Sequence, residues 1–254
     1  MPRYISAPYV SAPCISVRYI SVLSVIFCFI SASVSAQTLT PKHIQASYEV
    51  TKNGLPFANV YEKFVISGST YKVESITKGI GIYALFGERK LSSSGELTGQ
   101  GLKPTHFELQ QGDNPKKALL ADFDWSKNAL RMTVKGELKE AELVPGTQDL
   151  ASYPYQFMFL PAPLKNDITV TLTTGKKLNQ YLYKINAEHE VLDVAGTQYK
   201  TLHLLPPAPL DANKPQETKE LWLAVEQHYV PVRILIVDDN GQKLEQTLTE
   251  LHVE

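Results

Sequence analysis

The chain has 254 residues and is nearly neutral, with 25 Lys and Arg against 26 Asp and Glu and a formal net charge of −1 at pH 7. This balance gives no electrostatic reason to expect nucleic acid or an anionic membrane surface as a partner. Its two cysteines, Cys14 and Cys28, both lie near the N-terminus.

Residues 1–36 have the composition of a secretory signal peptide. Arg3 and Arg18 are their only charged residues, an apolar segment covers residues 19–30, and Val34-Ser35-Ala36 offers a cleavage site of small residues. The apolar segment is shorter than the roughly 20 residues that a membrane-spanning helix needs. Cleavage is therefore favoured over a retained membrane anchor.

Cleavage would leave residues 37–254 as a single exported β domain in the periplasm, with no stable membrane span. Loss of Arg3 and Arg18 lowers the net charge to about −3. The mature chain has no cysteine, which excludes disulfides, thiol nucleophiles and thiolate metal sites. Its length is sufficient to bury one core.

Strand signals dominate the mature chain. The segment "IQASYEVTKNG", residues 44–54, alternates apolar and polar residues and ends in an Asn-Gly pair, which is typical of a two-residue hairpin turn. Similar turn signals lie at Ser67-Gly68-Ser69, Ser126-Lys127-Asn128, Lys135-Gly136, Thr174-Gly175, Ala195-Gly196 and Asn240-Gly241. The pattern predicts an all-β fold, an antiparallel meander that forms an open or flattened β-barrel.

The segment "KGIGIYALFGE", residues 78–88, is too short and too rich in glycine for a regular strand. Its glycines bracket four large apolar residues, among them Tyr83, Leu85 and Phe86. Such a segment is typical of a mobile apolar lid, a membrane-contacting loop or a surface that binds a partner. The alternative is a short helical turn that caps one end of the barrel, with Leu85 and Phe86 buried.

Residues with catalytic or metal-binding chemistry are scattered. Asp122 and Asp124 lie on one strand face, at a spacing that a glycosidase could use, although two aspartates beside a turn more often form a solvated strand end. In "AEHEVLD", Glu188, His189 and Glu190 alternate between strand faces and make a poor metal site. We expect no enzyme, no catalytic residues, no metal and no cofactor; a hydrolase that uses the two aspartates is the residual alternative.

One helix is predicted in "DLASYPYQFMFLPAP". A helix that begins at Ser152 and ends before Pro161 places Tyr153, Phe157 and Leu160 on one face. Pro154 is compatible with its first turn. We expect this helix to pack on or inside the concave side of the sheet, where Tyr153 and Phe157 would be candidates for ligand contacts.

Near the C-terminus, a long solvated loop is predicted at residues 205–220, followed by two or three strands. Trp222 lies in the first strand and is either a core residue or part of a ligand pocket. The second strand, in "HYVPVRILIVDDNG", is apolar on both faces except for Arg233. That arginine either binds an anionic head group inside the concavity or forms a salt bridge with Glu220, Glu226, Glu245 or Glu250.

Four phrases in order carry a resemblance to a known family. They are "SSSGELTGQGLKPTHFEL", "ADFDWSKNAL", "GTQDLASYPYQFMF" and "ELWLAVEQHYVPVRI". Together they resemble the exported bacterial family known as domain of unknown function 3108, over roughly residues 45–252. The resemblance implies a periplasmic or otherwise exported protein. The closing "YVPVRILIVDDNGQKLEQTLTEL" is also similar to a strand pair of the lipoprotein-carrier half-barrel.

We therefore expect a non-enzymatic periplasmic protein of the cell envelope that binds a lipid, an acyl chain or another amphipathic molecule in a β-barrel concavity. The candidate ligand-binding residues are Arg233, Trp222, Tyr83, Leu85, Phe86, Tyr153 and Phe157. The alternative is an envelope assembly protein with a filled core, which binds another protein through its apolar loop or its strand edges.

Overall fold

The computed structural model describes residues 40–254 except 115–117, 165, 187–189 and 208–216. The expected leader, residues Glu188 and His189, and most of the loop expected at 205–220 lie outside the described residues. No helix in the described part of the chain is long and apolar enough to cross a membrane.

The described residues contain sixteen strands, which belong to one sheet. The strands are β1 (His43–Lys52), β2 (Leu55–Ser67), β3 (Thr70–Gly79), β4 (Arg89–Thr98), β5 (Gly101–Gln111), β6 (Leu119–Asp124), β7 (Ala129–Val134), β8 (Glu137–Glu142), β9 (Gln148–Asp149), β10 (Ile168–Thr173), β11 (Leu178–Ile185), β12 (Glu190–Val194), β13 (Thr197–Leu205), β14 (Thr218–Ala224), β15 (Val230–Val237) and β16 (Lys243–Val253).

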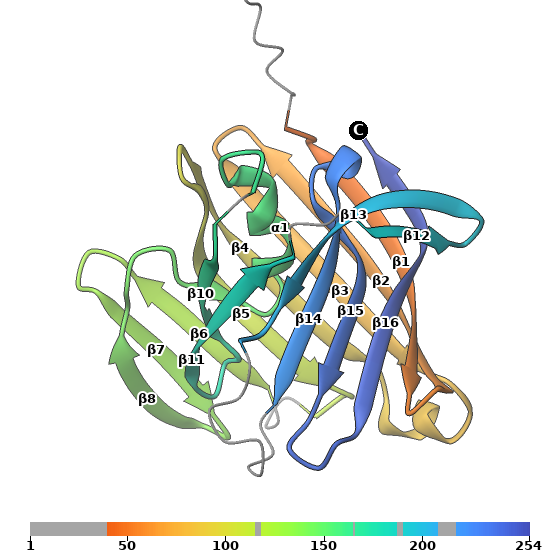
Figure 1. The fold of residues 1–254 in the computed structure, drawn as a ribbon. Coiled ribbons are helices and arrows are strands. Elements are labelled where there is room, and N and C mark those ends of the chain that lie inside the picture. The colour runs from red at the N-terminus through yellow and green to blue at the C-terminus, as the bar shows by residue number, and fades with distance from the viewer. Residues whose placement is uncertain (1–39, 115–117, 165, 187–189, 208–216) are drawn as a thin grey trace, which may run out of the picture. The chain divides into compact units, whose positions relative to one another are not determined.

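The sheet is a largely antiparallel meander, which confirms the predicted fold class. Its order is β8-β7-β6-β5-β4-β3-β2-β1-β16-β15-β14-β13-β11-β10-β9, and β12 pairs with β13. The two-residue strand β9 is parallel to β10. The strands at the two ends of this order do not pair with each other, so the sheet curls without closing (Figure 1).

The hairpins form where the sequence places their turns. Between β1 and β2, Asn53 and Gly54 have φ values of 50° and 80°. Two consecutive positive φ values are required by the tight turn that matches the twist of antiparallel strands, and Asn and Gly adopt them most easily. Lys135-Gly136 between β7 and β8 repeats this geometry, with φ values of 54° and 83°.

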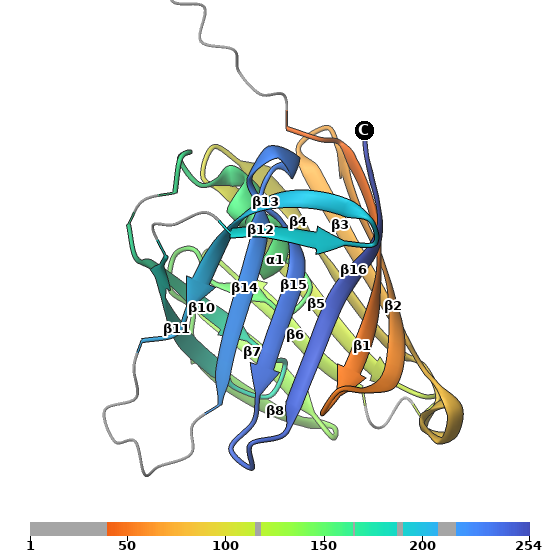
Figure 2. The same cartoon turned by 45° about the vertical axis from the view of Figure 1, so that its right-hand side comes forward.

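A short helix, α1 (Tyr153–Gln156), lies inside the curl of the sheet (Figures 1 and 2). A 3-10 turn, η3 (Phe157–Phe159), continues it, and both end before Pro161 as the sequence predicted. Pro154 occupies the first turn, where its missing N–H costs no helical hydrogen bond. Tyr153, Tyr155 and Phe157 are all buried, so α1 packs mainly through its aromatic side chains.

Asp149, at the end of β9, holds the start of α1 in place. Its Oδ1 accepts hydrogen bonds from the backbone N–H groups of Ala151 and Ser152, both at 2.9 Å. Its Oδ2 accepts a hydrogen bond from the Ser93 hydroxyl of β4, at 2.6 Å. Burial raises the pKa of Asp149 to about 6. The single carboxylate therefore connects β4, β9 and α1.

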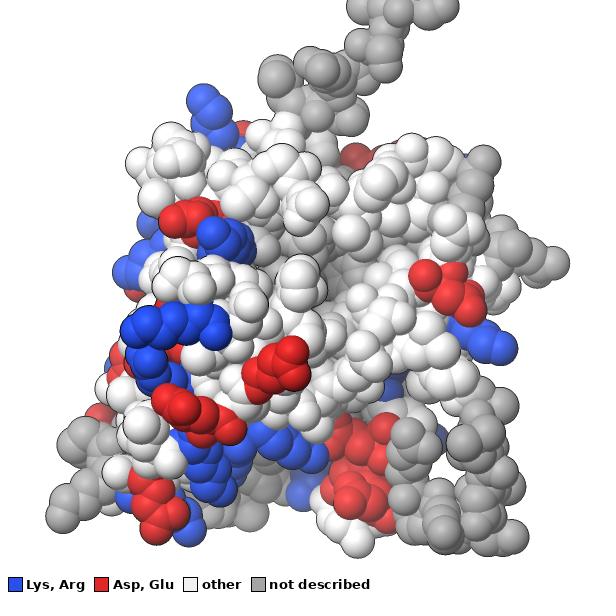
Figure 3. Space-filling view, turned by 90° about the vertical axis from the view of Figure 1, so that its left-hand side faces the viewer, with Lys and Arg blue, Asp and Glu red and all other residues white. Residues whose placement is uncertain are grey.

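The face at the left of Figure 1 carries both signs of charge (Figure 3). On β7, Arg131 contacts Glu140 at 3.1 Å and Asp124 at 3.7 Å. Interspersed charges of this kind produce no strong single-sign field over the surface.

Candidate functional site

A cavity of about 170 Å³ lies inside the curl of the sheet. Side chains of β2, β3 and β4 form one wall, side chains of β14, β15 and β16 form the opposite wall, and residues between 150 and 154 line the end next to α1. Val60, Leu91, Ile234 and Ile236 supply apolar surface. These residues face inward because alternate residues of a strand point to the same face.

Two cationic side chains also line this cavity. Lys219 of β14 is only 6% exposed. Its ammonium lies 5.0 Å from the ring centre of Tyr153 and 5.3 Å from that of Tyr181. The pKa of Lys219 is lowered to about 8, chiefly by burial; the Glu217 carboxylate opposes this shift, and the positive charge of Arg89 on β4 adds to it. Burial also lowers the pKa of Arg89.

Glu62 of β2 is the acidic residue in the cavity wall. The Tyr155 hydroxyl donates to one of its carboxylate oxygens at 2.9 Å, and the Ser75 hydroxyl donates to the other at 3.2 Å. Burial raises the pKa of Glu62, and the two hydroxyl donors partly offset this rise. Through these two hydrogen bonds Glu62 connects β2, β3 and α1, and within the described residues it forms no ion pair with either cavity cation.

A second pocket, of about 390 Å³, continues the cavity toward η1 (Gly81–Phe86), a 3-10 turn between β3 and β4. Thr77 and Arg89 belong to the walls of both spaces. Phe57, Tyr83 and Phe86 give this mouth its aromatic lining, and the rings of Phe57 and Tyr83 lie 4.5 Å apart. The mouth pocket is therefore mainly aromatic, with Arg89 shared between the two spaces, whereas Glu62 and Lys219 line the inner cavity alone.

The turn η1 has no buried residue. The short helical turn considered from the sequence is present, but the burial expected for Leu85 and Phe86 in that alternative is wrong, because their exposed fractions are 87% and 69%. Tyr83 packs against Phe57 and lets the rest of the turn project outward. Gly79 permits this path, since a Cβ there would lie 2.4 Å from the Tyr83 carbonyl.

Arg233 and Trp222 lie together, outside the cavity. Arg233 points to the face of β15 opposite to Ile234 and Ile236, and its guanidinium carbon lies 4.6 Å from the centre of the Trp222 ring. Its Nε is 2.9 Å from Glu245, an ionic contact that is not aligned as a hydrogen bond. This contact agrees with the salt-bridge alternative considered for Arg233.

Trp222 belongs to a polar cluster that attaches β12 and β13 to β14. Its indole N–H donates to Glu190 at 2.9 Å, and the His203 ring stacks on it at 3.9 Å. The two ring nitrogens of His203 contact Glu190 and Glu220, each at 3.0 Å. The hydrogen bond from Trp222 is the largest effect that lowers the pKa of Glu190. The cluster is a packing interface between strands.

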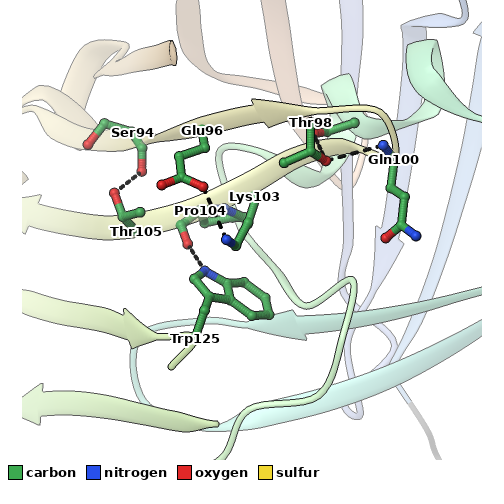
Figure 4. Close-up of polar contacts among 9 residues, drawn as sticks. Ser94, Glu96, Thr98, Gln100, Lys103, Pro104, Thr105 and Trp125 are labelled. Atoms are coloured by element: carbon green, nitrogen blue, oxygen red, sulfur yellow. Dashed lines mark hydrogen bonds and ion pairs between the residues drawn. The ribbon is translucent and has the colours of Figure 1, made fainter. Parts of the chain in front are cut away.

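The four family-like phrases also meet in space. Trp125, in the second phrase, donates its indole N–H to the Pro104 carbonyl of the first phrase at 2.6 Å (Figure 4). Gln156, in the third phrase, accepts a hydrogen bond from the Leu102 backbone N–H at 2.7 Å. The fourth phrase adds Val230 to the core cluster that contains Tyr155. The phrases therefore mark structural contacts around β4, β5 and α1.

The two aspartates considered for hydrolysis lie on the surface of β6. Asp122 contacts His106 at 2.7 Å, and its side chain is 61% exposed. Asp124 accepts a hydrogen bond from the Ser126 hydroxyl at 2.7 Å, which lowers its pKa. Within the described residues, no group of three or more His, Cys, Asp and Glu side chains is arranged to hold a metal.

The structure thus brings three of the seven candidate residues to the walls of these two adjoining spaces, namely Tyr83, Phe86 and Tyr153. Phe157 is buried in the core, and Leu85 projects outward from η1. Sequence reasoning missed Arg89 and Lys219. In "KELWL", however, Lys219 has the same strand parity as Leu221 and Leu223, and this alternation indicates an inward-facing lysine.

Comparisons with known proteins agree with this architecture. A Brucella abortus protein described as a beta-barrel-like protein of domain of unknown function DUF1849 is similar in structure, with a TM-score of 0.56 and 10% sequence identity, over 85% of this chain and 99% of that chain. At this identity the likeness shows the fold alone. Curated proteins gave no match. The profile described as "Protein of unknown function (DUF3108)" matches residues 47–249, so the chain belongs to the DUF3108 family.

Proposed function

We propose that the protein is a non-enzymatic, exported binding protein of the cell envelope, and that it holds an amphipathic molecule such as a lipid or acyl chain inside its curled sheet. The observation that carries the proposal is a pair of adjoining spaces, the cavity and the mouth pocket, which share Thr77 and Arg89 as wall residues. An aromatic mouth lined by Tyr83 and Phe86 leads past Thr77 to a chamber with charged side chains. This polarity gradient matches a molecule with an apolar part and a polar head.

The dimensions of the mouth and the lining of the inner end support this assignment. The mouth pocket, at about 390 Å³, falls within the range of small-molecule sites. Residues 150–154, next to α1, line the far end of the chamber. A ligand would therefore enter beside η1, which acts as a gate because none of its residues is buried.

Native mass spectrometry of residues 37–254 purified from a periplasm tests the proposal. We expect the wild-type protein to carry a co-purifying amphipathic molecule. Thr77→Trp places a large side chain where the two spaces join and should abolish this cargo. Thr70→Trp, at the exposed start of the same strand, is the matched control and should retain it. A wild-type protein that is free of cargo and takes up no added envelope lipid would contradict the proposal.

A second candidate function is binding of an envelope protein through η1. The observation that favours it is the exposure of Ile82, Leu85 and Phe86, at 73%, 87% and 69%. Leu85→Ser separates the two functions because Leu85 does not line the mouth pocket. Under the lipid-binding proposal this change leaves the cargo in place. Loss of a co-purifying protein, with no lipid in either sample, would favour the partner instead.

A further inference from the structure

Arg89 and Lys219 face the same chamber from opposite walls of the sheet. In the described part of the chain, neither cation has a carboxylate within ion-pair distance. The Arg89 guanidinium makes no hydrogen bond to a described residue, and the Lys219 ammonium contacts the ring faces of Tyr153 and Tyr181. Two positive charges therefore share a small space without a direct counter-ion.

This arrangement is unfavourable for folding alone. Desolvation disfavours both charged forms, and two like charges raise each other's electrostatic energy. An unpaired buried cation is usually avoided in a protein core. The Tyr153 and Tyr181 rings stabilise the Lys219 ammonium by cation–π contacts, but they accept none of its hydrogen bonds. The Lys219 ammonium and the Arg89 guanidinium thus face the chamber as hydrogen-bond donors, and neither contacts an acceptor on a described side chain.

We propose that Arg89 and Lys219 form an oxyanion site, and that the head group of the bound molecule is a carboxylate or a phosphate. The inference rests on the proposed function and gives it a ligand class. A planar guanidinium can donate two parallel hydrogen bonds to such a group, and an ammonium adds a compact point charge. The apolar tail of the ligand would then lie toward Tyr83 and Phe86.

The other groups that face Lys219 leave this site positive. Glu62 on β2 is bound by the Tyr155 and Ser75 hydroxyls. Glu217, which precedes β14, is exposed and accepts a hydrogen bond from Tyr181 at 3.3 Å. The hydroxyl groups of Tyr153 and Tyr181 are neutral at pH 7, because burial raises the pKa of both. The affinity for an anion should consequently fall as the pH rises above about 8, because Lys219 of the ligand-free protein gives up its proton there.

Titration calorimetry with three probes tests the site: dodecyl phosphate below its critical micelle concentration, dodecanol below its solubility limit, and inorganic phosphate. We expect the wild-type mature protein to bind dodecyl phosphate more tightly than dodecanol. Arg89→Gln and Lys219→Met should each weaken dodecyl phosphate binding by about 10- to 100-fold, the range for a lost charge-assisted contact. Both variants should bind dodecanol as the wild type does.

Matched controls exclude a general effect of charge. Arg131→Gln and Lys200→Met remove one exposed cation each and should leave dodecyl phosphate binding unchanged. Lys219→Arg keeps the charge and should restore most of the affinity. Far-UV circular dichroism checks that every variant is folded.

Each outcome separates this inference from the proposed function. Equal binding of dodecyl phosphate and dodecanol in all variants would overturn the oxyanion site and leave the amphipathic cavity standing. Inorganic phosphate that binds as tightly as dodecyl phosphate would support the site but contradict the role of the apolar mouth. Absence of binding by all three probes would contradict both.

Discussion

Lys219 is the residue at which stability and ligand binding should conflict. Its pKa falls from 10.5 to about 8 in the folded state, so folding disfavours its charged form. A shift of this size corresponds to a cost on the order of 3 kcal/mol while the lysine is protonated in both the folded and the unfolded state. The residue is thus costly for the fold and suited to an anionic ligand.

Lys219→Met should therefore stabilise the protein without ligand by about 3 kcal/mol at pH 7. Between about pH 8 and pH 10.5 the unfolded state holds the Lys219 proton and the folded state does not, so wild-type stability rises with pH relative to the variant. The difference in the free energy of unfolding between Lys219→Met and the wild type should thus become smaller as the pH rises from about 8 to 10.5. Urea unfolding at a series of pH values measures it, and a variant that is less stable than wild type at pH 7 would contradict the account.

Arg233 has a different role, because its guanidinium packs on the Trp222 ring and shields it from solvent. We expect Arg233→Ala to cost about 1 kcal/mol, because the cation–π contact and the shielding of the indole are both lost. The emission of Trp222 should shift to longer wavelength, measured with Trp125→Phe in the background so that one tryptophan remains. Lys200→Ala serves as the surface control. If Arg233→Ala lost the bound ligand and left the Trp222 emission unchanged, Arg233 would contribute to ligand binding rather than to the packing of Trp222.

At the scale of elements, α1 depends on the carboxylate of Asp149. Asp149→Ala leaves the N–H groups of Ala151 and Ser152 and the Ser93 hydroxyl without their acceptor. We expect a loss of about 3 kcal/mol or more in the free energy of unfolding, since each buried unpaired group costs about 1–3 kcal/mol. Asp149→Asn keeps one acceptor oxygen and should lose less. Asp167→Ala, at an exposed position, should be neutral; equal stability of all three variants would refute this role.

The turn η1 should move without unfolding the sheet. In Gly79→Ala the new Cβ would overlap the Tyr83 carbonyl and displace η1. Because η1 buries no residue, global stability should fall by less than about 1 kcal/mol, whereas protease cleavage within residues 80–87 should increase. The control is Gly99→Ala, where the added Cβ meets no atom within 4 Å. Unchanged cleavage in Gly79→Ala would show that η1 is not held by this close approach.

Local signals explain why many elements could be predicted from the sequence. Asn53-Gly54 and Lys135-Gly136 determine their hairpins because turn geometry is a property of two residues. The helix at Tyr153 follows from local spacing. The cavity cations could not be predicted as a pair, because Arg89 and Lys219 are more than a hundred residues apart and meet only through the curl of the sheet. The apolar neighbours of Arg233 made it a candidate ligand-binding residue, but the sequence alone could not decide which face of β15 points to the interior of the sheet.

At the scale of the whole molecule, the sheet does not close, so its two edge strands must be protected from pairing with another sheet. The edge strand β8, "ELKEAE", is exposed and mostly charged, which disfavours pairing with another sheet. The opposite edge strand, β9, has only two residues, and Gln148 donates to the Leu102 carbonyl of β5 at 2.8 Å. The sheet thus curls until its edge strand β9 lies against β5, a strand inside the same sheet. The parallel pairing of β9 with β10 had no signal in the sequence, because it depends on this long-range contact.

The central claim is that ligand lies inside the curl of the sheet. A diazirine-labelled fatty acid, cross-linked to the mature protein by light and located by peptide mass spectrometry, tests it most directly. We predict labels on inward-facing residues of β2, β3, β14 and β15 and on η1, with labelling strongly reduced in Thr77→Trp. Labels confined to the outer face, around Trp222 and Arg233, or labelling that Thr77→Trp leaves unchanged, would contradict the account.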